Sequence, residues 1–529
     1  MEFDVIIRNG SILDGSGRQA FRSDVGVAGR TVAAIGDLSG ANAGEVLDAA
    51  GKVVTPGFID AHRHADTAIF RDGFGKAELL QGLTTVINGN CGLSAAPVFG
   101  PHKHDVAAYL YPITGELGNT PVERLSDYLS ALKRRPLPIH AGMLVGLGTV
   151  RAAVAGFQKT LTDADYRAIH AILEQSLSEG ALGVSLGLGY APECFFRTEE
   201  LISALEPIRN TDVTLSIHMR SESMNLLDSI DEALAIAKAL NVPLQISHLK
   251  AVGKDRWGKL VYDALGKIRR AREDGLDVMC DAYPYTAGST QLLHVLPPEF
   301  LEGGTDAIAK RLIDPAAQKL LKERLETGTD FDNYAMLIGW ENIEIASARR
   351  EADRSLIGNT IAEAAEDMEP WRFCAELLSR NACAVTMIDR LTQGDDIAAI
   401  YKEPFSYVIS DATYPRDGLL HPRVYGTFVH VLERFVRERK LLTLAEAVHK
   451  MTRMPADRYG LQRKGRIEIG ADADLLIFDP ASVHEQATYR QPERFSEGID
   501  TVLVNGVPAV KDGVFTGKKN GTVLERRNV

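Results

Sequence analysis

The chain has 529 residues, 45% of them hydrophobic and 25% charged, so it is long enough for one large α/β domain with an accessory domain. Its 71 acidic and 59 basic residues give a formal net charge of −12, which disfavours binding to nucleic acid. No apolar stretch reaches the about 20 residues that cross a bilayer, and no signal peptide is evident. The five scattered cysteines indicate a reducing compartment. We therefore expect a cytoplasmic protein without membrane or nucleic-acid partners; the sequence leaves a homo-oligomer open.

The two ends of the sequence have a similar texture of short strands separated by turn residues. The first ~55 residues show it, and it returns near the C-terminus in GRIEIGADADLLIFD and DTVLVNGVPAVKDGV. This pattern predicts that residues 1–55 and 460–529 pair into one small β-sandwich domain.

The middle of the sequence, residues 56–459, alternates strand-like apolar runs with amphipathic, helix-like stretches. Eight candidate strands occur there: GFIDAHRH, TTVINGNC, IHAGMLVG, GVSLGLGY, TLSIHMRS, PLQISHLK, DVMCDAYPY and SYVISDAT. Eight such units predict a (β/α)8 barrel, a TIM-like fold whose chemistry lies at the carboxyl ends of the strands. The connection between the seventh and eighth strands is unusually long. We expect a helical insertion at about 287–404 that covers the active site.

Polar side chains with metal-ligand chemistry follow five of these strands. The first strand ends in a His-x-His pair whose members share one face, because strand side chains repeat every second residue. A lone pair of this kind is weak evidence, but the other strands add a thiol, two imidazoles and a carboxylate. The six residues are His62, His64, Cys91, His218, His248 and Asp411. Because a barrel brings strand ends together, the set predicts a metal site.

Nitrogen, thiolate and carboxylate ligands together suit Zn²⁺. Bound zinc lowers the pKa of a water molecule to about 7 and polarises a carbonyl group, which is the chemistry of amide hydrolysis. Asp411 is the natural general base, since a carboxylate beside the metal can take a proton from water and pass it to a leaving nitrogen.

With these motifs the chain resembles the amidohydrolase superfamily and, within it, the D-aminoacylase (N-acyl-D-amino-acid deacylase) family. The resemblance spans nearly the whole chain. The stretches that carry it are PGFIDAHRH, NGNCG, SLGLGYAP, ISHLKAVGKDRWGK, DAYPYTAGST, HPRVYGTF and GRIEIGADADLLIFD.

The resemblance implies how the ligands divide. Cys91, His218 and His248 would hold a tightly bound zinc, and a second, weakly occupied site would use His62, His64 and Asp411. In many relatives a carbamylated lysine on the fourth strand bridges two metals. This chain has no lysine there, and the resemblance gives that role to Cys91.

The resemblance also assigns residues that bind the carboxylate or carbonyl of the substrate: Lys250, Tyr190, Tyr283 and Ser289. Lys250 has support of its own, because a cation two residues after His248 points to the same side of the strand. Arg220 stands in the same relation to His218, and Arg416 follows Asp411 closely. Each arginine either contacts the substrate or serves as a structural or surface residue.

These residues support three functions. The first is metal-dependent hydrolysis of N-acyl-D-amino acids to a carboxylate and a free D-amino acid. The second keeps the zinc chemistry but acts on another carboxylated or cyclic amide. The third is a catalytically silent barrel that serves as a binding protein, which the intact ligand set disfavours. A serine hydrolase is also conceivable, because GVSLG places Ser185 in a G-x-S-x-G pattern, but the pattern lies within an apolar run rather than at a turn into a helix.

Overall fold

The structure, a computed structural model, describes residues 2–416 and 418–526. Eight consecutive positions of a parallel barrel are filled by short, buried strands, as the sequence predicts. They are β6 (Phe58–Asp60), β7 (Leu83–Asn88), β8 (His140–Met143) with its continuation β9 (Val145–Gly146), β10 (Gly183–Gly187), β11 (Thr214–His218), β12 (Leu244–Ile246), β13 (Val278–Ala282) and β17 (Ser406–Val408). Strands buried on both faces carry continuous apolar sequences, which is why these runs do not alternate.

Backbone contacts close the strands into a ring. The strands form one sheet of three strands and one of six, and every neighbouring pair in the two sheets is parallel. At one junction the Asp411 amide donates to the His62 carbonyl over 2.9 Å, and Arg63 bridges to Ala412. At the other, the Leu182 amide donates to the Met143 carbonyl over 2.9 Å. The ring confirms the predicted (β/α)8 barrel.

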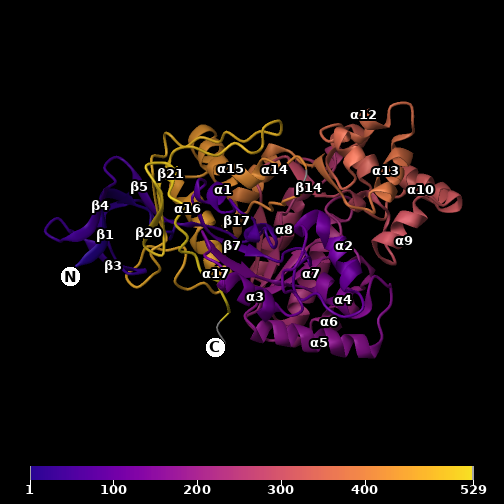
Figure 1. Cartoon of the computed structure of the whole chain (residues 1–529), viewed down its shortest axis with the longest axis horizontal. Helices are drawn as coiled ribbons and strands as arrows, with labels where there is room; N and C mark the ends of the chain where they lie inside the picture. Colours follow the sequence, from indigo (N-terminus) through magenta and orange to yellow (C-terminus); the bar gives the residue numbers. More distant parts are fainter. Residues whose placement is uncertain (1, 417, 527–529) are drawn as a thin grey trace.

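Helices cover the outside of the barrel (Figure 1). The main ones are α3 (Leu125–Lys133), α4 (Leu147–Ala155), α5 (Asp163–Ser178), α6 (Thr198–Ala204), α7 (Leu226–Leu240), α8 (Leu260–Glu273), α14 (Gly394–Lys402), α16 (Leu444–Met451) and α17 (Arg453–Arg458). Helix α5 shows how the sequence sets one of them. The Thr162 hydroxyl caps its first turn by accepting from the Asp165 amide, and Ile169, Leu173 and Ser176 form its buried stripe.

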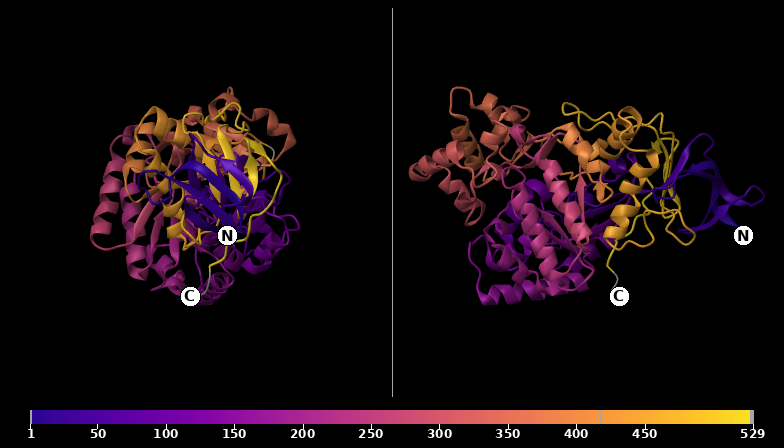
Figure 2. Two further views of the ribbon diagram at one scale, coloured as in Figure 1. Left: turned by 90° about the vertical axis from the view of Figure 1, so that its left-hand side faces the viewer. Right: turned by 180° about the vertical axis from the view of Figure 1, so that it is seen from behind.

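Strands from both ends of the chain pair in one nine-stranded sheet beside the barrel. They are β1 (Phe3–Ile12), β2 (Phe21–Ala28), β3 (Thr31–Gly36), β4 (Ala43–Asp48), β5 (Val53–Pro56), β18 (Leu475–Phe478), β19 (Ile499–Val504), β20 (Val507–Lys511) and β21 (Val514–Phe515). The two sets meet where β18 runs antiparallel to β5. Figure 2 shows the indigo and yellow strands side by side. The sheet branches at β1 and surrounds its own apolar cluster, which includes Val5, Val25, Leu475 and Leu503.

The segment between β13 and β17 stands at the opposite end of the molecule from the nine-stranded sheet (Figure 1). It is largely helical, as expected, with α9 (Gly304–Arg311), α10 (Pro315–Thr327), α11 (Tyr334–Leu337), α12 (Ile361–Ala365) and α13 (Pro370–Arg380). It also contains a three-stranded antiparallel sheet, which the expectation of a helical insertion did not include. Its strands are β14 (Ala287–Gln291), β15 (Ile343–Ala348) and β16 (Val385–Arg390), with β16 in the centre.

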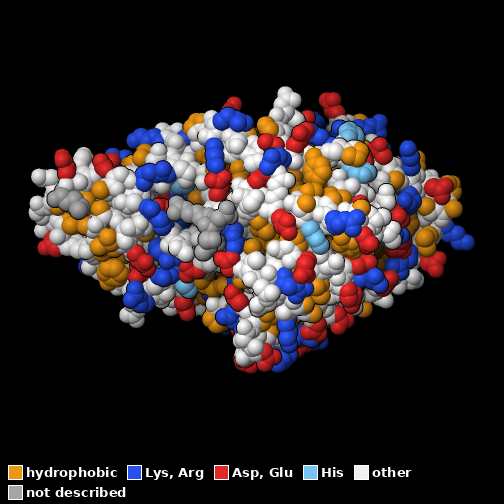
Figure 3. Space-filling model, turned by 90° about the horizontal axis from the view of Figure 1, so that it is seen from below, with side chains coloured by type: hydrophobic (Ala, Val, Ile, Leu, Met, Phe, Trp, Pro, Cys, Tyr) orange, Lys and Arg blue, Asp and Glu red, His pale blue; other side chains and the backbone are white. Residues whose placement is uncertain are grey.

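The surface carries both signs of charge. On the face seen from below, lysine and arginine side chains are interspersed with acidic ones over the part of the chain that the structure describes (Figure 3). None of the described helices is long and apolar enough to span a membrane.

Candidate metal centre and active site

Six polar side chains from five strand ends meet at one end of the barrel. His62 and His64 follow β6, Cys91 follows β7, and His218 is the last residue of β11. His248 lies just beyond β12, and Asp411 just beyond β17. The right-handed βα units of a barrel place all of these ends at the same face.

Three of the six residues have a strained backbone. Cys91, His248 and Asp411 have φ angles of 54°, 35° and 54°, in the left-handed region that non-glycine residues rarely adopt. Such strain persists only where the surrounding structure imposes it, and it clusters at functional sites. In this protein the left-handed backbone is found at three residues whose side chains all point into the ligand group.

The ligand atoms of four residues form a close group. The His62 Nε2 atom lies 3.2 Å from Cys91 Sγ and 3.4 Å from Asp411 Oδ1. Cys91 Sγ is 3.4 Å from His248 Nε2, and His64 Nε2 is 3.3 Å from Asp411 Oδ1. One atom from each of His62, Cys91, His248 and Asp411 lies within 4.8 Å of all the others.

His218 joins this group through His248, because its Nδ1 atom is 3.0 Å from His248 Nε2. A second candidate group of ligands is formed by His218, Glu222 and His248. The division that the resemblance implied, with Cys91, His218 and His248 on one metal, therefore stays a prediction, because the contacts link Cys91 equally to His62.

The donor set fits a zinc ion. Imidazole, thiolate and carboxylate are zinc's usual ligands. Burial lowers the pKa of His62 and His218 well below their usual range, so both rings are neutral and have a lone pair to donate. Burial likewise raises the pKa of the Cys91 thiol well above its usual range, and a bound cation is what would stabilise its thiolate. The buried Nε2 atom of His218 has no hydrogen-bond partner among the described residues.

Asp411 is held ionised at the edge of this group. Burial by itself would raise its pKa, but the Arg423 guanidinium and a hydrogen bond from His64 outweigh burial and hold the pKa well below its usual range. Arg423 Nη1 lies 2.9 Å from Asp411 Oδ2, and Arg423 Nη2 donates to the Ser289 carbonyl over 2.8 Å. Asp411 is therefore a carboxylate anion, with one oxygen toward the two histidines and the other toward Arg423.

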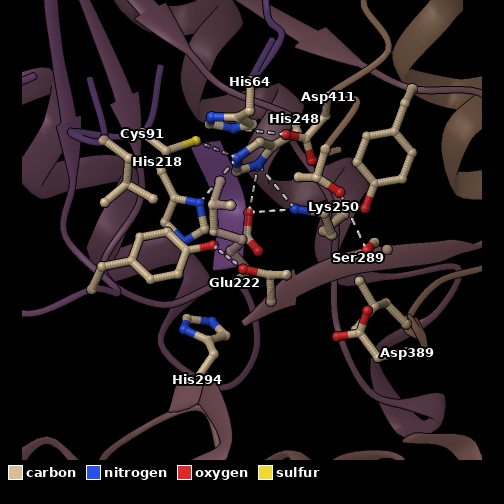
Figure 4. Close-up of a pocket in the computed structure, with 18 of the residues that line it drawn as sticks. His64, Cys91, His218, Glu222, His248, Lys250, Ser289, His294, Asp389 and Asp411 are labelled. Carbon is tan, nitrogen blue, oxygen red and sulfur yellow. Dashed lines mark hydrogen bonds and ion pairs between the residues drawn. The ribbon is translucent and has the colours of Figure 1, made fainter. Parts of the chain in front are cut away.

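Glu222 links the metal group to Lys250. Its Oε1 atom lies 3.0 Å from His248 Nδ1 and 2.6 Å from Lys250 Nζ (Figure 4). The His248 amide also donates to Asp281 Oδ1 over 2.6 Å. A carboxylate that accepts from the far nitrogen of a metal-binding histidine fixes the ring and its tautomer.

A pocket opens directly onto the metal group. Its wall contains Lys250, Tyr190, Tyr283 and Ser289, the four residues that the resemblance assigned to substrate binding. The segment between β13 and β17 supplies Tyr283 and Ser289 of these four, and it adds Gly288, Thr290, His294, Tyr334, Asp389 and Leu391 to the lining.

The two arginines predicted as substrate contacts do not line this pocket. Arg220 pairs with Glu232 over 2.9 Å and donates to two backbone carbonyls near α6. The side chain of Arg416 is 60% exposed and pairs with Glu116 over 2.5 Å. The structure gives both arginines an ion-pairing role.

Two further residues lie near the ligands. Arg63 points away from the metal group and is fully buried between Asp60 and Glu78, with which it forms ion pairs at 2.9 and 2.7 Å. Ser185 is no exposed nucleophile: it lies inside β10, and its hydroxyl donates to the Gly89 carbonyl and accepts from the Gly92 amide. That bonding supports the turn that carries Cys91.

Several polar residues of the site were not predicted from the sequence, among them Glu222, His294, Asp389 and Arg423. Glu222 directly follows the stretch TLSIHMRS and Arg423 lies in HPRVYGTF, so a search for charged neighbours of the ligands could have found them. His294 and Asp389 had no such signal, because they reach the pocket through the tertiary fold of a long insertion.

Comparisons with known proteins agree with this geometry. The profile described as "Amidohydrolase family" matches residues 45–193 and 417–510. D-aminoacylase of Alcaligenes xylosoxydans xylosoxydans is 34% identical over 525 residues, which cover 99% of this chain and 98% of the relative. N-acyl-D-glutamate deacylase of the same organism is 33% identical, with 99% and 97% covered.

Solved structures give the same result. A crystal structure of D-aminoacylase superimposes with a TM-score of 0.83 at 33% identity, covering 99% of this chain and 100% of the other. N-acyl-D-glutamate deacylase of Bordetella bronchiseptica, complexed with zinc and a phosphonate mimic of the tetrahedral intermediate, gives 0.85 at 31% identity, with the same coverage. Fold and site thus define a metal-dependent amidohydrolase. Full-length identity above 30% is more specific: the chain belongs to the D-aminoacylase (N-acyl-D-amino-acid deacylase) family.

Proposed function

We propose that this protein hydrolyses the amide bond of N-acyl-D-amino acids, releasing a carboxylate and a free D-amino acid. The observation that carries the proposal is that one pocket contains both a group of metal ligands and a buried cation. The ligands at one end are His62, Cys91, His248 and Asp411, and Lys250 lines the same cavity. A metal group beside a buried cation suits an amide substrate that carries a carboxylate.

The ligand group would hold zinc through Cys91 and the histidines, with Asp411 at its edge. Zinc bound there would act as a Lewis acid, lowering the pKa of water and polarising the carbonyl group of the amide. Glu222 keeps the His248 ring in place, and Ser185 supports the loop of Cys91.

Asp411 is the proposed general base and acid. Its carboxylate takes a proton from the attacking water and then gives that proton to the leaving amide nitrogen, which departs as a free amine. Arg423 orients the carboxylate from the side opposite the two histidines. This orientation is needed because the proton must be taken and delivered along different directions.

The α-carboxylate of the substrate would bind near Lys250. The side chains of Tyr283 and Ser289 line the same part of the pocket, and the Tyr283 ring lies under both Lys250 and Arg423, 5.7 and 5.1 Å from ring centre to cation. Lys250 is paired with Glu222 in the structure, so a substrate carboxylate would share an already positioned ammonium group. Preorganised charge of this kind binds without a large entropic cost.

Two of the similar proteins are named for D-amino-acid substrates, and this supports the D configuration for the present chain. The test is a panel of paired N-acetyl-D- and N-acetyl-L-amino acids given to the zinc-loaded protein, with free amine measured over time. We expect hydrolysis of the D series. Preference for the L series would overturn the substrate while leaving the metal site intact. Absence of hydrolysis from both series, with zinc shown to be bound by mass spectrometry, would overturn the proposed reaction.

A further inference from the structure

The wall of the pocket that faces the metal group carries a carboxylate, Asp389. In Figure 4 it lies with His294 on the side away from His64 and Asp411, and Lys250 and Ser289 lie between. Asp389 belongs to β16, the central strand of the three-stranded sheet, and it pairs in register with Gly288 of β14.

The Asp389 carboxylate is buried and open toward the cavity. The residue is 1% exposed, it lines the pocket, and its Oδ1 atom has no hydrogen-bond partner among the described residues. A methyl group on Gly288 would come within 2.9 Å of this oxygen and 3.2 Å of the Tyr283 hydroxyl. The glycine therefore leaves the carboxylate uncovered.

The nearby cations are already engaged. Lys250 pairs with Glu222 over 2.6 Å, and Arg423 pairs with Asp411 over 2.9 Å. A substrate α-carboxylate bound at Lys250 would add a second anionic partner to this ammonium group. A buried carboxylate without a hydrogen-bond donor destabilises the protein, because the free energy of hydration that it loses exceeds that of a neutral hydrogen bond. Asp389 is thus available to accept a hydrogen bond from another part of the substrate, its side chain.

His294 forms the neighbouring part of the wall. Its ring lies 4.9 Å from the Tyr190 ring and 5.2 Å from the Tyr334 ring, and its Nδ1 atom has no partner among the described residues. Burial raises the pKa of Asp389 to about 7, the effect expected of a desolvated carboxylate, so its ionised form is present at pH 7 and a bound N–H donor would stabilise that form further.

We propose that Asp389 is the specificity-determining residue of the side-chain subsite, and that it selects N-acyl-D-amino acids whose side chains end in an N–H donor, an amide or an ammonium group. Side chains that end in a carboxylate are rejected, because they would place a second negative charge beside Asp389 in a cavity where burial weakens screening. This inference rests on the proposed function and gives it a substrate class. It sets this chain apart from the relative named for N-acyl-D-glutamate.

Two matched pairs of substrates test it on the zinc-loaded, full-length protein. N-acetyl-D-glutamine and N-acetyl-D-glutamate differ in one donor group, and N-acetyl-D-lysine and N-acetyl-D-norleucine differ in the terminal ammonium. We expect kcat/KM to favour glutamine over glutamate and lysine over norleucine by about tenfold or more, as for one charge-assisted hydrogen bond. The difference should lie mainly in KM.

The variant Asp389→Asn keeps the shape and removes the charge. It should lower the glutamine-to-glutamate ratio by about tenfold, since an amide can donate to the substrate carboxylate. The matched control is Asp396→Asn on α14. Asp396 is also fully buried with one unpartnered oxygen, but it lies outside the pocket and accepts from the Gly258 amide over 2.9 Å. The control should leave the ratio unchanged.

The outcomes separate this inference from the proposed function. If the wild-type protein prefers glutamate to glutamine, or if Asp389→Asn leaves the ratio unchanged, the inference is overturned while hydrolysis of the D substrates stands. If none of the four D substrates is hydrolysed while other N-acetyl-D-amino acids are, only the inference is overturned; if no N-acetyl-D-amino acid is hydrolysed, both ideas fall together. Should Asp389→Asn not fold, the two wild-type ratios decide the matter alone.

Discussion

The two sides of the pocket are built in opposite ways. At the barrel end the polar atoms contact one another: His62, Cys91, His248 and Asp411 are linked by distances of 3.2 to 3.4 Å. The barrel end also has two unpartnered nitrogens, His64 Nδ1 and His218 Nε2, but each ring is held in the ligand group through its other nitrogen. On the wall from the segment between β13 and β17, Asp389 and His294 each keep a buried polar atom without a partner among the described residues, and neither belongs to the ligand group.

This difference separates the shared chemistry from the choice of substrate. The ligands stand on short strands fixed by the barrel, where small displacements would break the metal group. The wall belongs to an insertion outside the barrel, and its unpartnered polar atoms are available to bind the substrate. A rigid scaffold that carries chemistry and a variable segment that carries specificity is the usual division in barrel enzymes. Changes at the barrel end should therefore alter kcat or metal content, and changes at the wall should alter KM.

The strongest test at the barrel end is Asp411→Asn. The amide cannot accept the proton of water, so kcat should fall by about 10²- to 10⁴-fold, the usual contribution of a general base. The same amide keeps one oxygen near His62 and His64, so bound zinc should fall less than activity does. Steady-state kinetics and metal analysis by mass spectrometry check both values. If activity and zinc content both survive, Asp411 is not the base.

A smaller effect is expected from Glu222→Gln, which acts through His248. Without the negative charge the His248 ring is held less firmly, and zinc affinity should fall by about 10- to 100-fold. Competition with a coloured chelator measures the affinity directly. Glu232→Gln is the matched control, because Glu232 pairs with Arg220 outside the pocket. Equal zinc affinity in the two variants would show that Glu222 serves only Lys250.

Local rules were sufficient to predict the barrel end from the sequence. His62 and His64 share a face because strand side chains alternate, and parallel strands bring Cys91, His218 and His248 to the same end. Each of these steps needs only the residue's position relative to its own strand. The strained φ angles were not predictable, because they follow from the assembled fold.

The wall could not be predicted in this way. Asp389 reaches the pocket only because β16 pairs with β14, about a hundred residues earlier in the sequence. The arginines show the same limit. Arg416 is near Asp411 in sequence and lies at the surface, whereas Arg423, further along the chain, returns at the start of α15 (Arg423–His430) to bind Asp411.

On the wall, Ser289→Ala should have a modest effect. The Ser289 hydroxyl lies 3.4 Å from the Thr413 hydroxyl and lines the pocket, so a substrate can use it as a hydrogen-bond partner. Loss of one neutral hydrogen bond should raise KM by about two- to tenfold with little change in kcat. Ser347→Ala is the control, since that hydroxyl bonds Thr386 outside the pocket. A larger fall in kcat than rise in KM would place Ser289 with the catalytic side.

The smallest effect is expected from Arg416→Ala. The Arg416 and Glu116 side chains are 60% and 57% exposed, so water and salt screen their ion pair. Removing such a surface group should change kcat/KM by less than about twofold, the range of most surface substitutions. The measurement is kcat/KM for one neutral and one acidic N-acetyl-D-amino acid at low and at physiological salt. A rise in KM confined to the acidic substrate would mean that Arg416 reaches over the pocket when substrate binds, and the boundary between the binding wall and the surface would then lie beyond β17.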